Sequence, residues 1–175
     1  MGGTPQLTAP LAAAMMGDVG ITYADLLDGQ DWVALSLDQQ TFPSYLWNDG
    51  GTLADAPVDF AATFDGAMWM SRKPIEIPLF NRNPLRVRAG FVVPRHHHNF
   101  DEMLMVFEGR YSIEYDDESG GTSTVVVGPG DVFVSHAGTA YTMTAGPEGV
   151  VYTETWPGPI RELTTTWHDH GWVRR

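Results

Sequence analysis

The chain of 175 residues contains no cysteine. Disulfides and thiolate ligands are therefore excluded, and any metal site must use nitrogen and oxygen donors, which points to a first-row divalent ion. No run of about eighteen apolar residues occurs, and the apolar stretch 11–16 lacks the basic flank of a signal peptide. We therefore expect a cytoplasmic protein with no membrane partner.

Basic residues are scarce, because 10 Lys and Arg stand against 22 Asp and Glu, which gives a formal net charge of -12. Residues 1–71 contain no Lys or Arg and carry nine aspartates. We interpret this acidic part as a solvated surface that keeps the protein soluble. A chain with this charge repels a polyphosphate backbone, so nucleic acid is not an expected partner.

Hydrophobic residues make up 43% of the chain and charged residues 18%, which at this length predicts one globular domain. From residue 85 onward, short segments rich in Val, Tyr, Thr and Phe alternate with turn residues. This pattern predicts an all-β barrel or sandwich. The expected strands are Leu85–Val93, Glu102–Phe107, Arg110–Tyr115, Thr122–Val127, Asp131–Ser135, Ala140–Thr144, Val150–Thr155 and Arg161–Trp167.

The first 84 residues are less regular than the rest of the chain. Short helical turns are predicted near 5–16 and 23–27, and extra strands near 32–37 and 67–71. We expect this part to pack on the outside of the barrel or to extend its sheets. The predicted division is an N-terminal extension at 1–84, a barrel at 85–167 and a C-terminal tail at 168–175.

The most informative segment combines a histidine-rich strand end with a glutamate. It reads Gly90-Phe-Val-Val-Pro-Arg-His96-His97-His98-Asn-Phe-Asp-Glu102-Met-Leu-Met-Val-Phe-Glu-Gly109. Alternate side chains of a strand share a face, so His96 and His98 converge with their Cα atoms about 7 Å apart, while His97 faces away. Glu102, at the start of the following strand, brings a carboxylate to the same point. Two imidazoles and one carboxylate form a ligand set for a divalent metal with open positions.

This segment resembles the first motif of the cupin superfamily, in which a glycine, five residues, His-x-His, three or four residues, Glu, six residues and a glycine follow in order. Every fixed position is present. The resemblance implies a cupin-type double-stranded β-helix, a jelly-roll barrel, with one divalent metal held by His96, His98 and Glu102. Fe(II) is the favoured ion, and Zn(II), Ni(II) and Mn(II) are the alternatives.

A second segment resembles the second cupin motif but departs from it at three positions. It reads Gly130-Asp-Val-Phe-Val-Ser-His136-Ala-Gly138-Thr-Ala-Tyr141. His136 stands where the family usually has a proline, Tyr141 where it has its third metal-binding histidine, and Ala145 where it has a closing asparagine. The likeness therefore covers about residues 85–156 and leaves the fourth ligand open.

Three interpretations of Tyr141 remain. Its phenolate ligates the metal, its phenol acts beside the metal as a hydrogen-bond donor or general acid or base, or it only lines the pocket wall. His136 and Arg88 are further catalytic candidates. His136 lies at the barrel mouth, where a plain surface histidine is the competing interpretation. Arg88 has the same strand parity as His96 and can bind a carboxylate or enolate if that register holds.

Cupins support many reactions, so the resemblance narrows the function only weakly. The first interpretation is an Fe(II) dioxygenase acting on a small aromatic or dicarbonyl substrate, because the strand pattern of 102–155 is similar to ring-cleaving cupins of the homogentisate and gentisate type. The second is a redox-free, metal-dependent lyase, isomerase or polyketide-type cyclase. The third is a non-catalytic barrel that binds a small molecule. Outward-facing Met103 and Met105, with the apolar N-terminal part, further predict a homodimer.

Overall fold

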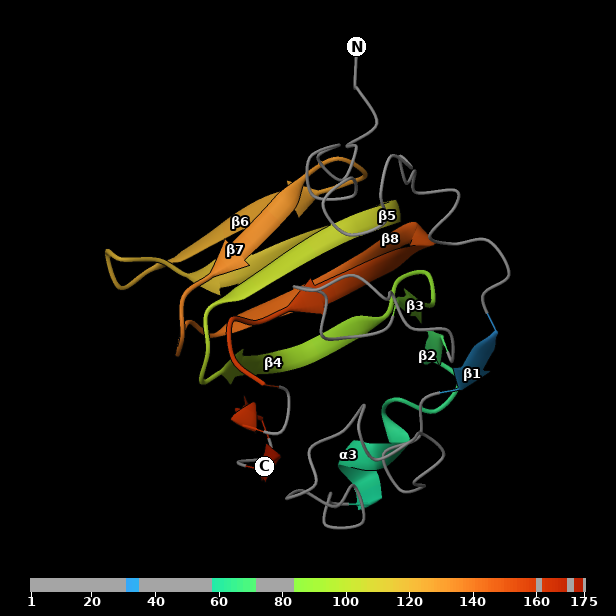
Figure 1. The fold of residues 1–175 in the computed structure, drawn as a ribbon, viewed down its shortest axis with the longest axis horizontal. Helices are drawn as coiled ribbons and strands as arrows, with labels where there is room; N and C mark the ends of the chain where they lie inside the picture. The colour runs from blue at the N-terminus through green and yellow to red at the C-terminus, as the bar shows by residue number, and fades with distance from the viewer. Residues whose placement is uncertain (1–30, 35–57, 72–83, 160–161, 170–171, 175) are drawn as a thin grey trace, which may run out of the picture.

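The computed structural model describes residues 31–34, 58–71, 84–159, 162–169 and 172–174, which are nearly all β (Figure 1). The elements are β1 (Trp32–Ala34), α3 (Val58–Ala62), β2 (Met68–Ser71), β3 (Leu85–Val87), β4 (Val92–His98), β5 (Glu102–Asp116), β6 (Thr122–Val127), β7 (Val132–Ser135), β8 (Tyr141–Thr155), β9 (Thr165–Trp167) and β10 (Trp172–Arg174). The predicted all-β class is confirmed. No helix among the described residues is long and apolar enough to cross a membrane.

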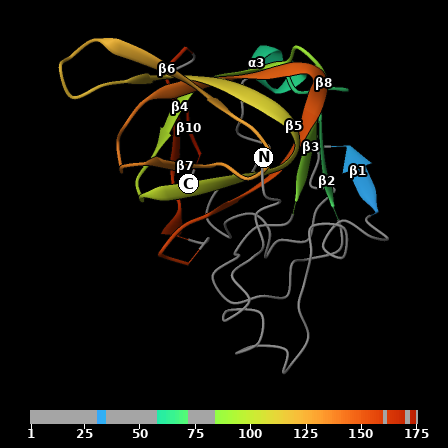
Figure 2. The same ribbon diagram turned by 90° about the horizontal axis from the view of Figure 1, so that it is seen from above.

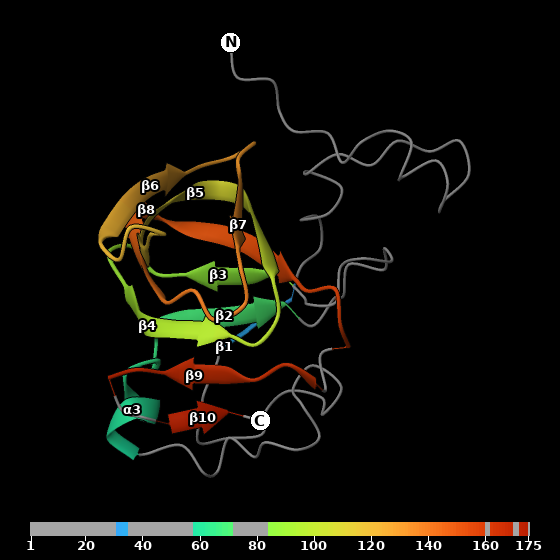
Figure 3. The same cartoon turned by 90° about the vertical axis from the view of Figure 1, so that its left-hand side faces the viewer.

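Two long strands, β5 and β8, organise the sheet. They pair antiparallel along most of their lengths, from Met103 opposite Thr155 to Tyr115 opposite Tyr141. The outer edge of β5 pairs with β7 and then with β6, and the outer edge of β8 pairs with β4 and then with β3. Views at right angles show the sheet curling around a common interior (Figures 2 and 3). This curled antiparallel sheet agrees with the predicted cupin-type jelly roll.

The interior is filled by alternate residues of the two long strands. Leu104, Val106 and Ile113 of β5 have no exposed surface, and each such side chain contributes about 1.5–3 kcal/mol relative to an exposed one. The neighbouring Met103 and Met105 are half-buried on the outer face, where their strand parity placed them. The predicted homodimer stays a prediction.

The prediction of one continuous strand at Leu85–Val93 was wrong, because a turn separates β3 from β4 within it. Gly90 has a φ of +69°, and the backbone N–H of Phe91 donates to the carbonyl oxygen of Arg88 at 3.1 Å. The positive φ allows a local kink between β3 and β4, which run in the same direction, both antiparallel to β8. Strand parity therefore does not carry over from Arg88 to the histidines.

The expected strands Glu102–Phe107 and Arg110–Tyr115 form the single strand β5, with a bulge at Glu108-Gly109 between them. Gly109 has the positive φ expected of it, +71°, and a Cβ added there would lie 1.9 Å from the carbonyl oxygen of Gly149. On β8, residues 146–149 lie opposite the single residue Arg110. The two expected strands Ala140–Thr144 and Val150–Thr155 therefore form one strand, β8, and the residues expected to separate them belong to this bulged part of it.

Short strands extend the sheet at both ends of its order. β1 and β2 continue it beyond β3, and β10 pairs with β9. The helical turns predicted at 5–16 and 23–27 lie outside the described residues, as do residues 35–37 of an expected strand. The division of the chain at residues 84 and 167 stays a prediction.

Asp117 organises the turn between β5 and β6. Its Oδ1 accepts hydrogen bonds from the backbone N–H groups of Ser119 and Gly121, each at 3.0 Å, and its Oδ2 accepts one from the Ser123 hydroxyl at 2.9 Å. The hydroxyls of Ser119 and Ser123, with the backbone donors, lower the pKa of Asp117 below its ordinary value of 3.8.

We predict that Asp117→Asn loosens this turn. Because the folded-state pKa lies below the unfolded value, the carboxylate stabilises the fold above about pH 4, and the contribution is lost as the pH falls through the lowered pKa. Amide-exchange protection of residues 118–123 should be weaker in the variant than in the wild type at pH 7, and the difference should shrink in acid. Equal protection of both proteins at pH 7 would contradict the assignment.

Candidate functional site

Four polar side chains converge in the barrel interior. His96 and His98 come from the end of β4, Glu102 begins β5 and Tyr141 begins β8. They are 3%, 6%, 1% and 0% exposed, respectively. The ring centroids of His96 and His98 are 5.2 Å apart, and those of His96 and Tyr141 are 4.5 Å apart. The structure thus brings together all four residues predicted as metal ligands.

The register of the strands places His96 at the centre of this cluster. It lies opposite Tyr141 of β8 on one side and opposite Trp167 of β9 on the other. The pairing of β4 with β8 is irregular between Val93 and His96, where Pro94 has no N–H to donate. The Pro94 carbonyl instead faces the His96 ring, at 2.7 Å from Nδ1.

Both histidine rings are anchored through the same nitrogen. His96 Nδ1 bonds the Pro94 carbonyl, and His98 Nδ1 lies 3.0 Å from the Thr165 hydroxyl of β9. Because a carbonyl oxygen can only accept, His96 donates from Nδ1, and in the neutral ring this leaves Nε2 as the unprotonated nitrogen that a metal ligand requires. The Nε2 atom of His98 lies 3.8 Å from Glu102 Oε2.

Glu102 is a carboxylate buried in the interior of the sheet, with 1% exposure. The Tyr141 hydroxyl donates a short hydrogen bond to its Oε2, and the Ser135 hydroxyl lies 3.5 Å from the same oxygen. A buried carboxylate is costly unless such donors surround it. Tyr141 is therefore bonded to a member of the predicted ligand set.

The chemistry of these donors fits a divalent first-row metal, since the set holds two imidazoles and one carboxylate, all buried. Within the described ranges, no three histidine, aspartate or glutamate side chains gather as closely as bound ligands would.

A tryptophan holds the His96 ring from the side opposite Tyr141. The Trp167 ring lies over the His96 imidazole, with centroids 4.5 Å apart and planes at 32°. Phe60 and Phe64 from the α3 region pack against Trp167 in turn, at 5.1 and 5.6 Å. The N-terminal part of the chain therefore supports the orientation of a site residue.

Sequence reasoning missed the contribution of β9. Thr165 and Trp167 alternate along that strand as His98 and His96 do along β4, and the two pairs face each other in antiparallel register. The alternation of a small polar and a large aromatic residue can be seen in the sequence. The pairing of this strand with the strand that carries the histidines cannot. Trp156, whose ring lies 5.4 Å from that of His98, was also missed.

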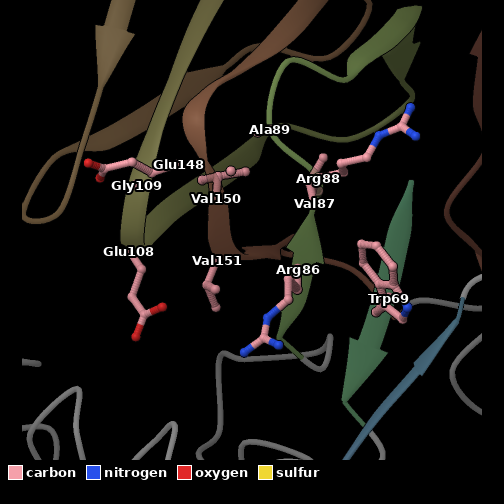
Figure 4. A pocket seen from close by; sticks show the side chains of 11 residues that line it. Trp69, Arg86, Val87, Arg88, Ala89, Glu108, Gly109, Glu148, Val150 and Val151 are labelled. Atoms are coloured by element: carbon pink, nitrogen blue, oxygen red, sulfur yellow. The ribbon is translucent and has the colours of Figure 1, made fainter. Parts of the chain in front are cut away.

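Arg88 and His136 are not brought to the cluster. Arg88 follows the end of β3, is exposed, and lines a different pocket on the outer face of the sheet (Figure 4). The turn at Gly90 is the physical reason, because it breaks the strand on which the parity argument depended. The side chain of His136 is 81% exposed, and its Nδ1 lies 3.6 Å from Asp101 Oδ1. This agrees with the interpretation of His136 as a surface histidine.

His97 faces away from its two neighbours, as the alternation of the strand predicted. Its Nδ1 lies 2.8 Å from Nε2 of His168, in the turn after β9. Partial burial and then the charge of His168 lower the pKa of His97. This pair stands apart from the interior cluster.

A pocket of about 590 Å³ opens beside the cluster. Trp156 and the prolines that follow it form an apolar wall, and Asp101 and Glu102 supply the charge. Its lining is Asp101, Glu102, Met103, Val134, Thr155, Trp156, Pro157, Gly158 and Pro159. Glu102 thus belongs both to the buried cluster and to a pocket large enough for a small molecule.

Comparison with known proteins gives partial likenesses to solved structures. No protein-family model and no curated protein matches the sequence. Oxalate decarboxylase from Bacillus subtilis aligns with a TM-score of 0.45 at 21% identity, over 53% of this chain and 25% of that chain. Pumpkin seed globulin aligns with a TM-score of 0.45 at 12% identity, over 58% of this chain and 23% of that chain. The chain spans about a quarter of the length of these neighbours.

We predict that Thr165→Val weakens metal binding without unfolding the barrel. The substitution keeps the shape of the side chain but removes the oxygen that orients His98 through Nδ1, and loss of such a partner typically costs about 10- to 100-fold in metal affinity. Competition with a fluorescent chelator would measure the change, and Thr166→Val on the same strand serves as the control. Wild-type affinity in Thr165→Val would contradict the anchoring role.

Proposed function

We propose that this chain is a metal-dependent enzyme of the cupin class that acts on a small organic molecule. The observation that carries the proposal is the buried convergence of His96, His98, Glu102 and Tyr141, in which both rings are anchored through Nδ1. In this proposal His96, His98 and Glu102 hold one divalent ion. When bound, the ion supplies Lewis-acid chemistry or, if it is redox-active, chemistry with dioxygen.

Tyr141 is proposed to carry a proton next to the ligand set. Its hydroxyl donates to Glu102 Oε2, and its ring lies beside that of His96. A phenol in this place orients the carboxylate and exchanges a proton with a group bound nearby. This contact supports the second of the three interpretations of Tyr141 over direct ligation, since the hydrogen-bonding phenol keeps its proton.

The pocket beside Glu102 supports an uncharged, partly apolar substrate. Asp101 and Glu102 are its charged members, and no Lys or Arg appears among the described residues of its lining. A dianionic molecule would meet two carboxylates there, whereas an aromatic or dicarbonyl compound can lie against Trp156 and the prolines. Arg88, the residue predicted to bind an anionic group, lines another pocket.

Within this class we propose oxidation of such a substrate by an Fe(II) dioxygenase. A redox-free lyase, isomerase or cyclase is the second candidate, and the contact between Tyr141 and Glu102 favours it because proton transfer is the chemistry that a phenol supplies. Oxygen uptake by the Fe(II)-loaded protein with catechols, hydroxyquinols and β-diketones separates the two reactions. Product formation under argon supports the redox-free one, and ligand-induced stabilisation without any product supports a binding protein.

We predict about one first-row divalent metal per chain. His96→Ala and His98→Ala should each abolish tight binding, because each removes one of two imidazole nitrogens. His97→Ala, whose side chain faces outward, is the matched control and should retain the metal. Elemental analysis of protein purified without added metal measures the content. Affinity should fall as the pH drops through the range in which histidines take up protons. Full metal content in the double variant of His96 and His98 would overturn the site.

We predict that Tyr141→Phe keeps the metal but lowers turnover by about 10²- to 10⁴-fold, the usual contribution of a positioned proton-transfer group. Without metal the variant should also be less stable, because a buried carboxylate loses a donor at a cost of about 1–3 kcal/mol. Tyr115→Phe is the control, because Tyr115 lies directly opposite Tyr141 on the neighbouring strand β5. Loss of metal in Tyr141→Phe would identify the phenolate as a ligand, and unchanged turnover would leave Tyr141 as pocket wall.

A further inference from the structure

A second pocket lies on the outer face of the sheet, away from the histidine cluster. It has a volume of about 350 Å³ and is lined mainly by β2, β3, β5 and β8. At its centre Val151 of β8 pairs with Arg86 of β3 on one side and with Glu108 of β5 on the other. Figure 4 shows the side chains of Arg86 and Glu108 extending to the same side of the sheet, with Val151 between them.

The strand geometry sets the distance between these two charges. Neighbouring strands lie about 4.8 Å apart, so the backbones of Arg86 and Glu108 are separated by about 10 Å. Within the described part of the chain, neither side chain forms an ion pair with the other or with a third residue. An apolar floor therefore separates a cation from an anion, and each is available to a ligand.

The environment of Arg86 prepares it to bind a carboxylate. Its guanidinium carbon lies 4.5 Å from the ring centroid of Trp32, and Trp69 is its partner on β2. A guanidinium stacked on an aromatic face keeps its N–H groups in its own plane, where they can make two parallel bonds to a carboxylate. Arg88 and Glu148 also line the pocket but point away from this row in Figure 4.

We propose that this pocket binds a small zwitterion with an apolar body, such as an amino acid. Its ammonium group binds Glu108, its carboxylate binds Arg86, and its side chain lies over Val151 toward Trp69. The charged groups of an amino acid are about 3 Å apart, and a hydrogen bond of about 2.9 Å at each end gives a span of about 9 Å, which the gap accommodates. A molecule with a single charge leaves one of the two protein groups without a partner.

Calorimetric titration of the full-length protein with three compounds of the same skeleton tests the proposal. The probes are L-phenylalanine, phenethylamine, which lacks the carboxylate, and hydrocinnamate, which lacks the ammonium. L-Phenylalanine should bind at least about tenfold more tightly than either, because each lost partner is a charge-assisted hydrogen bond. Failure of L-phenylalanine to bind, or equal binding of the three, would overturn the proposal.

Two variants assign the binding to the named charges. Glu108→Gln should weaken L-phenylalanine binding by about tenfold without weakening that of hydrocinnamate, and Arg86→Gln should weaken L-phenylalanine but not phenethylamine. Glu114→Gln makes the same charge change at an exposed position further along β5, outside the pocket lining, and is the control. Wild-type binding of L-phenylalanine in both pocket variants, or an equal loss in the control, would overturn the site. Metal content, measured in parallel, should be unchanged in all three.

Discussion

The buried carboxylate of Glu102 is the constraint on which the interior of this barrel depends. A carboxylate with 1% exposure is tolerated only where donors replace water. Two different strands provide donors to Oε2, with Tyr141 from β8 and Ser135 from β7. The His98 ring from β4 lies beside the same oxygen, with Nε2 at 3.8 Å. The curl of the sheet that brings these strands together is thus the same feature that makes Glu102 stable. At this point of the fold, the packing of the strands and the stabilisation of the buried carboxylate depend on each other.

The orientation of the two histidine rings depends on residues that lie further from Glu102. Trp167 is held between the His96 ring and two phenylalanines of the N-terminal part, and Thr165 on the same strand holds His98. Strand β9 therefore supports both rings, one by packing and one by hydrogen bonding. A cluster built from β4, β5 and β8 alone would lack the Trp167 contact to His96 and the Thr165 contact to His98.

The local part of this arrangement could be predicted from the sequence, and the non-local part could not. His96, His98 and Glu102 lie within seven residues of one another, so strand alternation places the two histidines together and the short connection 99–101 brings Glu102 beside them. Thr165 and Trp167 join them through a pairing with β9 that no local pattern specifies. Arg88 was assigned to the wrong face because the Gly90 turn breaks the strand. Two strands were expected on either side of Gly109, whereas β5 continues through it, because a glycine with positive φ suits a turn and a bulge alike.

The long β5 and β8 ladder has a consequence for the order in which the chain folds. Tyr141 lies 39 residues after Glu102, and Thr165 lies 67 residues after His98. Contacts between residues so far apart in sequence form slowly, since the intervening chain must close before they are made. During synthesis from the N-terminus, the glutamate and both imidazoles emerge well before the groups that anchor them. The interior cluster can therefore be completed only after residues 141 and 165 have been synthesised.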